Sequence, residues 1–184
     1  MFNSQFSMSL KKLNPENVRL LIVHCVANKC NKPFTSDMLI ACGKAKYGQC
    51  SYHYYVRRSG DVIPLLPESV QGVHARHYND CSLGIVYEGG LNEKGQPADT
   101  RTEAQKHALY ELLKSLTRDY PNARIVGHSE LPEQRMPIEQ VLDWLSRDPS
   151  QRSQLPRVAK DCPCFQSQEY QDLQPSSRSD RDTD

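Results

Sequence analysis

The sequence lacks a long apolar stretch, a signal for secretion and any internal repeat. No run of 18 apolar residues occurs in the chain of 184 residues, so nothing in it predicts a transmembrane helix. The N-terminal stretch MFNSQFSMSLKKLN has no basic start followed by a long apolar segment, which is the form of a secretion signal. We therefore expect the protein to be soluble in the cytoplasm when it is made.

The chain also lacks an excess of either charge. It has 23 Lys and Arg against 22 Asp and Glu, for a net charge of +1. This balance argues against electrostatic capture of nucleic acid or of an anionic membrane. Seven cysteines at uneven spacings fit reduced thiols, with one or two used in chemistry, better than a closed disulfide framework. One oxidised pair stays possible. We expect a monomer.

Short apolar runs bounded by turn residues predict the strands. Buried strands are expected where β-branched and leucine residues run without alternation, and a hairpin where aromatic residues flank a glycine turn. The expected strands cover Arg19–His24, Ser82–Gly90 and Ala123–His128, and the hairpin turns at Arg58–Asp61.

Apolar residues at helical spacing predict three helices. They cover Ser36–Lys46 with Thr35 or Ser36 as cap and Leu39 and Cys42 on the apolar face, a segment from Glu103 to before Pro121, and Pro137–Arg147. Thr100, three residues before Glu103, is a possible capping-box residue. The alternation predicts one α/β domain, a central mixed sheet of about five strands flanked by helices.

We expect that domain to cover residues 18–166, after an N-terminal arm at 1–17. Residues 167–184, SQEYQDLQPSSRSDRDTD, are polar and poor in apolar side chains. Such a segment buries too little apolar surface to offset the entropy of ordering. It is expected to be a disordered tail.

Two histidines, His24 and His128, each end a buried strand, and the stretch AKDCPCF adds Cys162 and Cys164. Three protein ligands with the fourth position open form the usual catalytic zinc site. Taken singly, a histidine at a strand end is more often a half-exposed polar residue, and a cysteine beside proline a small buried thiol. From spacing alone, a metal site is only weakly indicated.

Five stretches, in order along the chain, together resemble the zinc-dependent N-acetylmuramoyl-L-alanine amidases, which are related to phage-type amidase lysozymes and peptidoglycan recognition proteins. IVHCVANK is similar to the strand of the family's first zinc ligand, and IVGHSEL to the motif of its second. YHYYVRRSGDV resembles the Tyr-His hairpin strand, and GVHARHYNDCSLGIVYEGG the segment from His-Ala to Gly-Gly. KDCPCF resembles the third-ligand motif, Cys-Pro-x-Phe.

The resemblance implies a Zn²⁺ ion held by His24, His128 and Cys162, in a groove at the strand ends. Cys162 is preferred to Cys164 because the family's ligand is the cysteine directly before proline. It also implies that Tyr52 lies beside the attacking water and that Lys160 faces the scissile carbonyl. A tyrosine hydroxyl can orient a water, and a lysine can stabilise a developing oxyanion.

His74 corresponds to the histidine that lines the substrate groove, and the implied substrate is peptidoglycan or a muropeptide. The expected reaction is hydrolysis of the amide between N-acetylmuramic acid and L-alanine. Without the resemblance, Tyr52 would be interpreted as a packed hairpin aromatic and Lys160 as a solvated charge.

The remaining histidines and cysteines have no assigned chemistry, and Cys25 should point away from His24 because side chains alternate along a strand. The chain departs from the family at Val26 and Asn28, which puts the loop after the first ligand in doubt, and at Ser129, where the family frequently has Arg. The helix expected at 137–147 lengthens the stretch before Cys162 and could wall the groove.

Two other functions stay open: a non-catalytic peptidoglycan-binding module, and a cysteine hydrolase that uses Cys25 or Cys162 as its nucleophile. The presence of Cys162 argues against the first, since non-catalytic members lack the ligand cysteine. The biological setting is also open between a lysin released onto the cell wall, a protein exported by a non-classical route, and a cytoplasmic recycler of muropeptides.

Overall fold

The buried strands form the centre of one mixed sheet. The computed structural model describes residues 10–147 and 161–175, and within them the five-stranded sheet has the order β4-β3-β5-β1-β7. Four strands run parallel and β4 pairs antiparallel with β3. All residues of β1 and β5 are buried, as in a strand covered on both faces. The bounds are β1 Leu20–Cys25, β3 Tyr54–Val56, β4 Val62–Pro64, β5 Ser82–Tyr87 and β7 Arg124–Gly127.

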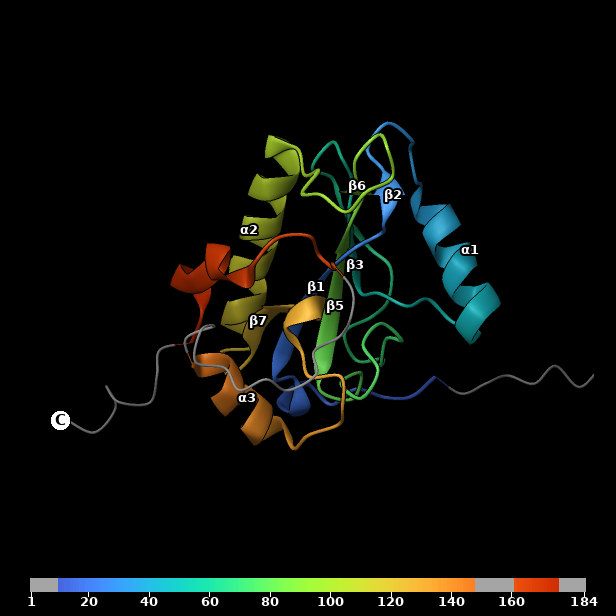
Figure 1. Cartoon of the computed structure of the whole chain (residues 1–184). Helices are drawn as coiled ribbons and strands as arrows, with labels where there is room; N and C mark the ends of the chain where they lie inside the picture. The colour runs from blue at the N-terminus through green and yellow to red at the C-terminus, as the bar shows by residue number, and fades with distance from the viewer. Residues whose placement is uncertain (1–9, 148–160, 176–184) are drawn as a thin grey trace, which may run out of the picture.

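Helices cover both faces of this sheet, with α1 and α2 on opposite sides of it in Figure 1. Leu21 and Val23 of β1 pack with the leucines of α2 (Glu103–Asp119). Leu20 and Ile22, which alternate with them and point to the opposite face, pack with α3 (Ile138–Ser146). Helix α1 (Ser36–Tyr47) packs on the same face of the sheet as α3, where Leu39 clusters with Tyr55 and Val86. The expected single α/β domain is therefore confirmed.

Two details of the helices differ from expectation. In α1 the buried residues are Leu39 and Gly43, while Cys42 is exposed. The capping box of α2 is formed by Thr102 and Gln105, whose side chains each accept from the other's backbone N–H at 3.1 Å. Thr100 does not cap the helix because its hydroxyl accepts a hydrogen bond from the backbone of Gly90 at 2.8 Å.

The remaining elements are short. A two-stranded parallel ladder joins β2 (Asn28–Lys29) to β6 (Gly90–Leu91). The 3-10 helices are η1 (Pro15–Asn17), η2 (His128–Glu130) and η3 (Ser167–Leu173). Before residue 18, Leu13 already belongs to the core. Among the described residues, no helix has the length and apolar character needed to span a membrane.

The first part of the expected disordered tail is ordered, which corrects the prediction for those residues. Ser167–Leu173 form η3, and Tyr170 is buried in the core on the α2 side of the sheet. Apolar side chains are few in this segment, and polar contacts stabilise it instead, because Glu169 and Tyr170 both bond to the buried Arg101. The rest of the expected tail, residues 176–184, lies outside the described residues.

A buried histidine, His53, attaches the hairpin to the central sheet. Its Nδ1 accepts from the backbone N–H of Gly84, and its Nε2 lies 2.9 Å from the carbonyl of Val70. Because Nδ1 is an acceptor, the ring must be neutral, with its proton on Nε2 and donated to Val70. Burial lowers the pKa of His53 below its usual value. The neutral form is the one that the fold requires.

This histidine should make the fold sensitive to mild acid. Its pKa is lower in the folded than in the unfolded chain, so its contribution to stability is present above the unfolded pKa of about 6.5 and is lost as the pH falls below it. We expect the unfolding free energy, measured by urea titration with a chelator between neutral pH and mild acid, to fall more steeply in wild type than in His53→Gln. The exposed His107 supplies a control, since His107→Gln should keep the wild-type slope. Equal slopes in all three proteins would contradict the prediction.

Candidate functional site

The parallel sheet brings two of the predicted ligands together at one edge. Val23 pairs with Gly127 in the register between β1 and β7, so the residues that follow, His24 and His128, lie level with each other. Their ring centroids are 4.6 Å apart. His24 is buried and projects to the face opposite Cys25, as strand alternation requires.

The third predicted ligand comes from the C-terminal segment, which crosses this edge of the sheet. The Sγ of Cys162 lies 3.7 Å from Nδ1 of His24. The loop is fixed by its backbone oxygens, since Cys162 O accepts from Ser129 N at 2.7 Å and Pro163 O accepts from the hydroxyl of Tyr87 at 2.6 Å. A Cβ on Gly127 would lie 2.7 Å from Pro163, so this close approach requires glycine.

The three side chains suit a single metal ion. One ligand atom from each of His24, His128 and Cys162 lies within 4.8 Å of the others. In a tetrahedral zinc site, bonds of about 2.0–2.3 Å place the ligand atoms roughly 3.3–3.8 Å apart. The separation of 3.7 Å between Cys162 and His24 already has this value, and small side-chain rotations would bring the third atom to it.

A chain of hydrogen bonds orients His24, the first predicted ligand. His24 Nε2 lies 3.1 Å from Nδ1 of His74, and His74 Nε2 lies 3.5 Å from the hydroxyl of Ser82, which donates to the carbonyl of Tyr78. One assignment of protons satisfies every link: His24 donates to His74, and His74 donates to Ser82. Nδ1 of His24 is then left unprotonated and faces Cys162, as a metal ligand must.

His74 is kept neutral, which this chain of bonds requires. Burial, with the neighbouring His53 and His128, lowers the pKa of His74 well below its ordinary value. A neutral ring can accept at Nδ1 while it donates at Nε2. Both ring nitrogens of His74 therefore meet protein atoms, and the contact with substrate that the sequence suggested for this residue stays a prediction.

Gly84 in β5 makes room for His74. A Cβ at this position would lie 2.6 Å from Cγ of the His74 ring, closer than real side chains approach. The strand must therefore carry glycine where the imidazole crosses it.

Tyr52 lies beside the proposed ligands. Its ring centroid is 5.2 Å from that of His24 and 6.1 Å from that of His74. Burial, and then the nearby Cys162 thiol, raise the pKa of Tyr52 above its ordinary value. The hydroxyl therefore keeps its proton at neutral pH and can donate a hydrogen bond.

Two further thiols lie on the other side of the Cys162 loop. Cys25 Sγ and Cys164 Sγ are 3.9 Å apart, and the backbone N–H of Cys25 donates to Cys162 Sγ at 3.4 Å. The hydrogen bond with Cys162, together with burial, raises the pKa of Cys25, and burial raises that of Cys164 to about 12. All seven cysteines are free of disulfides, as expected.

Several residues that position the site were not predicted from the sequence. Ser82 and Gly84 contact the ring of His74, and Glu130 bonds to the backbone of Gly127, next to His128. Buried Glu130 accepts from the backbone of Gly127 and from Ser167 at 3.0 Å, and so joins the second-ligand segment to η3. Because Glu130 is a polar residue in a largely polar loop, nothing in the sequence indicates that it is buried. Lys160 lies outside the described residues.

Comparison with known proteins gives a family match over most of the chain. The model of the family described as N-acetylmuramoyl-L-alanine amidase matches residues 14–150. The endolysin of Enterobacteria phage K11 is 30% identical over 124 residues, which are 67% of this chain and 82% of that protein. The endolysin of Escherichia phage T7 is 28% identical over 134 residues, or 72% and 89% of the two chains.

A solved structure shares the fold. N-acetylmuramoyl-L-alanine amidase LysC from Clostridium intestinale URNW superposes with a TM-score of 0.54 at 24% identity, and the match covers 76% of this chain and 93% of that one. At this identity the likeness shows the arrangement of helices and strands.

The packing of His74 on Gly84 can be tested through metal binding. We expect Gly84→Ala to displace the His74 ring, release His24 from its partner, and remove most of the rise in melting temperature that a divalent zinc salt gives the wild-type protein. Gly95→Ala is a control that strains the backbone away from the site, because Gly95 has a positive φ of 85° and lies in the loop after β6. It should lower the melting temperature and keep the full metal-induced rise. A full rise in Gly84→Ala would show that His74 does not support the site.

Proposed function

The chain belongs to the N-acetylmuramoyl-L-alanine amidase family, and on that premise we propose that it is a zinc enzyme whose ion is held by His24, His128 and Cys162. It is a peptidoglycan amidase, which hydrolyses the amide that joins the lactyl group of N-acetylmuramic acid to L-alanine. Zinc with one open coordination position is a Lewis acid that activates water and polarises a carbonyl. The observation that supports zinc best is the meeting of two imidazoles and a thiol, from three separate segments, within 4.8 Å.

Each neighbouring residue has a proposed task. Protonated Tyr52 donates a hydrogen bond that orients the attacking water or the substrate carbonyl. His74 accepts a hydrogen bond from Nε2–H of His24 and so holds Nδ1 of His24 toward the ion. For Lys160 the support comes from the sequence motif, and its ammonium would stabilise negative charge on the carbonyl oxygen.

Two cysteines separated by one residue allow a sharp test of the ligand set. Cys162→Ser should lower zinc content and amidase activity severely, because serine is a poor zinc ligand. Cys164→Ser should change both little, since Cys164 bonds to backbone oxygens and to Cys25. Metal analysis of the purified proteins and mass spectrometry of digested peptidoglycan give the two readouts. Equal losses in the two variants would show that the ligand is misassigned.

Chelation separates a metal hydrolase from a cysteine hydrolase. The contact of 3.7 Å between Cys162 and His24 would also suit a thiol nucleophile and its base. We expect a chelator to abolish the release of stem peptides that begin with L-alanine, and zinc to restore it. Activity that survives chelation but not thiol alkylation would favour the cysteine mechanism.

The hydroxyl of Tyr52 should matter for turnover and not for metal binding. Tyr52→Phe keeps the aromatic ring that packs on His24 and removes the hydroxyl, which is the hydrogen-bond donor of this side chain. We expect zinc content equal to wild type and kcat lower by about 10²-fold or more, the size of a positioned proton donor or acceptor. Wild-type kcat in Tyr52→Phe would exclude the proposed role.

A further inference from the structure

The ligand Cys162 lies in a segment that the sheet does not hold. Residues 161–175 form no strand, and their only regular element is η3. Cys162 itself bonds to the backbone of Ser129 and of Cys25, and the rest of the segment is held by contacts of the residues that follow. Several of these contacts converge on one side chain, that of Arg101.

Arg101 precedes α2 and has a fully enclosed guanidinium, with its side chain only 1% exposed. All five of its N–H groups have acceptors. Nε and one terminal nitrogen donate to the two oxygens of Asp99 at 2.9 and 2.7 Å, and both terminal nitrogens donate to the two oxygens of Glu169 at 2.8 Å. The fifth donor bonds to the hydroxyl of Tyr170 at 3.0 Å.

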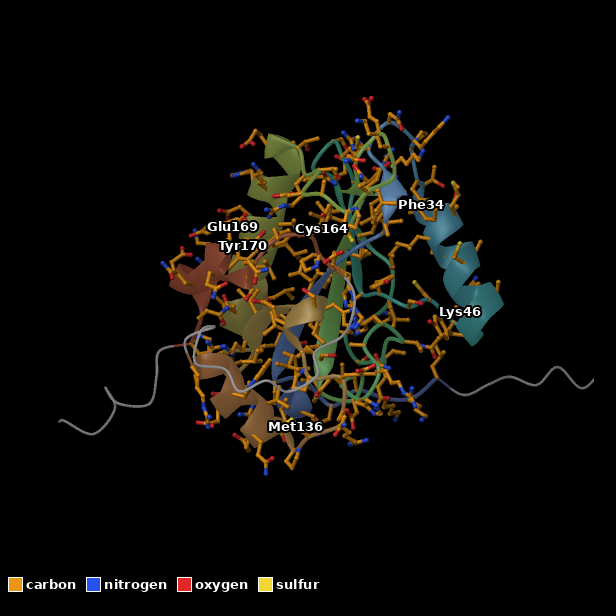
Figure 2. All side chains as sticks on the ribbon, in the orientation of Figure 1. Phe34, Lys46, Met136, Cys164, Glu169 and Tyr170 are labelled. Atoms are coloured by element: carbon orange, nitrogen blue, oxygen red, sulfur yellow. The ribbon has the colours of Figure 1, made fainter. Side chains whose placement is uncertain are left out.

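The face of the same guanidinium lies on Phe165, three residues after Cys162. The carbon of the guanidinium is 3.4 Å from the ring centroid. Phe165 also packs against Tyr170 and Tyr87, with centroid separations of 6.0 and 6.1 Å. Figure 2 shows Glu169 and Tyr170 together beside α2, with Cys164 on the segment that leads from them toward the end of the sheet.

Arg101 thus holds two points of the segment at once, Phe165 by its face and Glu169 by its edge. The guanidinium is buried, whereas the carboxylates of Asp99 and Glu169 are 35% and 42% exposed, so loss of the cation removes its bonds to both without leaving a fully buried charge. Here the loss of one cation would leave the carboxylates of Asp99 and Glu169 facing each other across the emptied site. Repulsion between them would move η3, and with it the segment that begins at Cys162.

We propose that Arg101 is a positioning residue for the third metal ligand: its contacts with Phe165 and Glu169 hold Cys162 where its sulfur meets His24 and His128. This inference rests on the proposed zinc site. It predicts a specific defect in Arg101 variants, in which the two histidines stay in place and the sulfur is lost from the coordination sphere. A residue that only stabilised the fold would leave the geometry of the bound metal unchanged.

Cobalt substitution distinguishes these two roles. Co²⁺ bound through a thiolate gives a ligand-to-metal charge-transfer band in the near ultraviolet, whereas Co²⁺ bound to imidazoles alone does not. We expect Arg101→Met, studied below its melting temperature, to bind Co²⁺ and Zn²⁺ about 10- to 100-fold more weakly than wild type, the range found for residues that orient metal ligands. Its charge-transfer band should fall toward that of Cys162→Ser. Arg101→Lys keeps the charge but cannot span both carboxylates, so it should restore affinity only in part.

A control variant breaks a more exposed ion pair just before β1, at the opposite end of the strand from His24. Arg19 bonds to Glu139 of α3 at 2.6 Å, and Arg19→Met should lower stability while it keeps the affinity and the charge-transfer band of wild type. Arg101→Met with affinity within twofold of wild type and a full band would overturn the proposal.

Milder variants keep the question open to test if Arg101→Met does not fold. Phe165→Leu removes the stacked ring, and Glu169→Gln removes one carboxylate charge, and each should weaken metal binding and the band in the same direction. Unchanged values in both would overturn the proposal. If the wild-type protein gave no charge-transfer band with Co²⁺, both the proposed zinc site and this inference would be wrong. If the wild-type protein gave the band and the Arg101, Phe165 and Glu169 variants all kept it, only this inference would be wrong.

Discussion

The proposed metal site depends on one geometric requirement: a ligand atom from each of His24, His128 and Cys162, which are distant in sequence, must come together at one edge of the sheet. Two of them are placed by the parallel pairing of β1 with β7, which sets His24 level with His128 at the carboxyl end of each strand. Strands that run side by side in the same direction deliver their last residues to the same edge. The third atom arrives without such a ladder, and side-chain contacts around Cys162 and Phe165 take the place of sheet hydrogen bonds.

Two buried histidines, His53 and His74, act through their neutral forms. His53 must accept from Gly84 and donate to Val70, and His74 must accept from His24 and donate to Ser82. In both rings, burial favours the uncharged state on which the bonds depend. Gly84 of β5, which leaves room for the His74 ring, therefore also influences which nitrogen of His24 carries the proton and which faces Cys162.

The elements that the sequence predicted best are those with a strong apolar period. The strands at Arg19–His24 and Ala123–His128 and the three helices appear within a residue or two of their expected bounds, because apolar side chains buried in the core set both the pattern and the structure. The cap of α2 was predicted two residues too early, since two threonines precede it and only tertiary contacts choose between them. The order in η3 could not be predicted, because it comes from Arg101, whose burial is invisible in a polar stretch of sequence. The meeting of His24, His128 and Cys162 was predicted from family motifs, and their spacing alone would not have revealed it.

In β1 two adjacent residues serve opposite layers of the protein. His24 faces the side of the sheet where His128 and His74 lie, and Cys25 packs into the layer beneath α2. Because the pleat has a period of two, a single inserted or deleted residue within the strand would exchange these two side chains between layers. The thiol would then occupy the place of the imidazole, and the imidazole would be enclosed among leucines. The length of this strand is therefore constrained as tightly as the identity of its histidine.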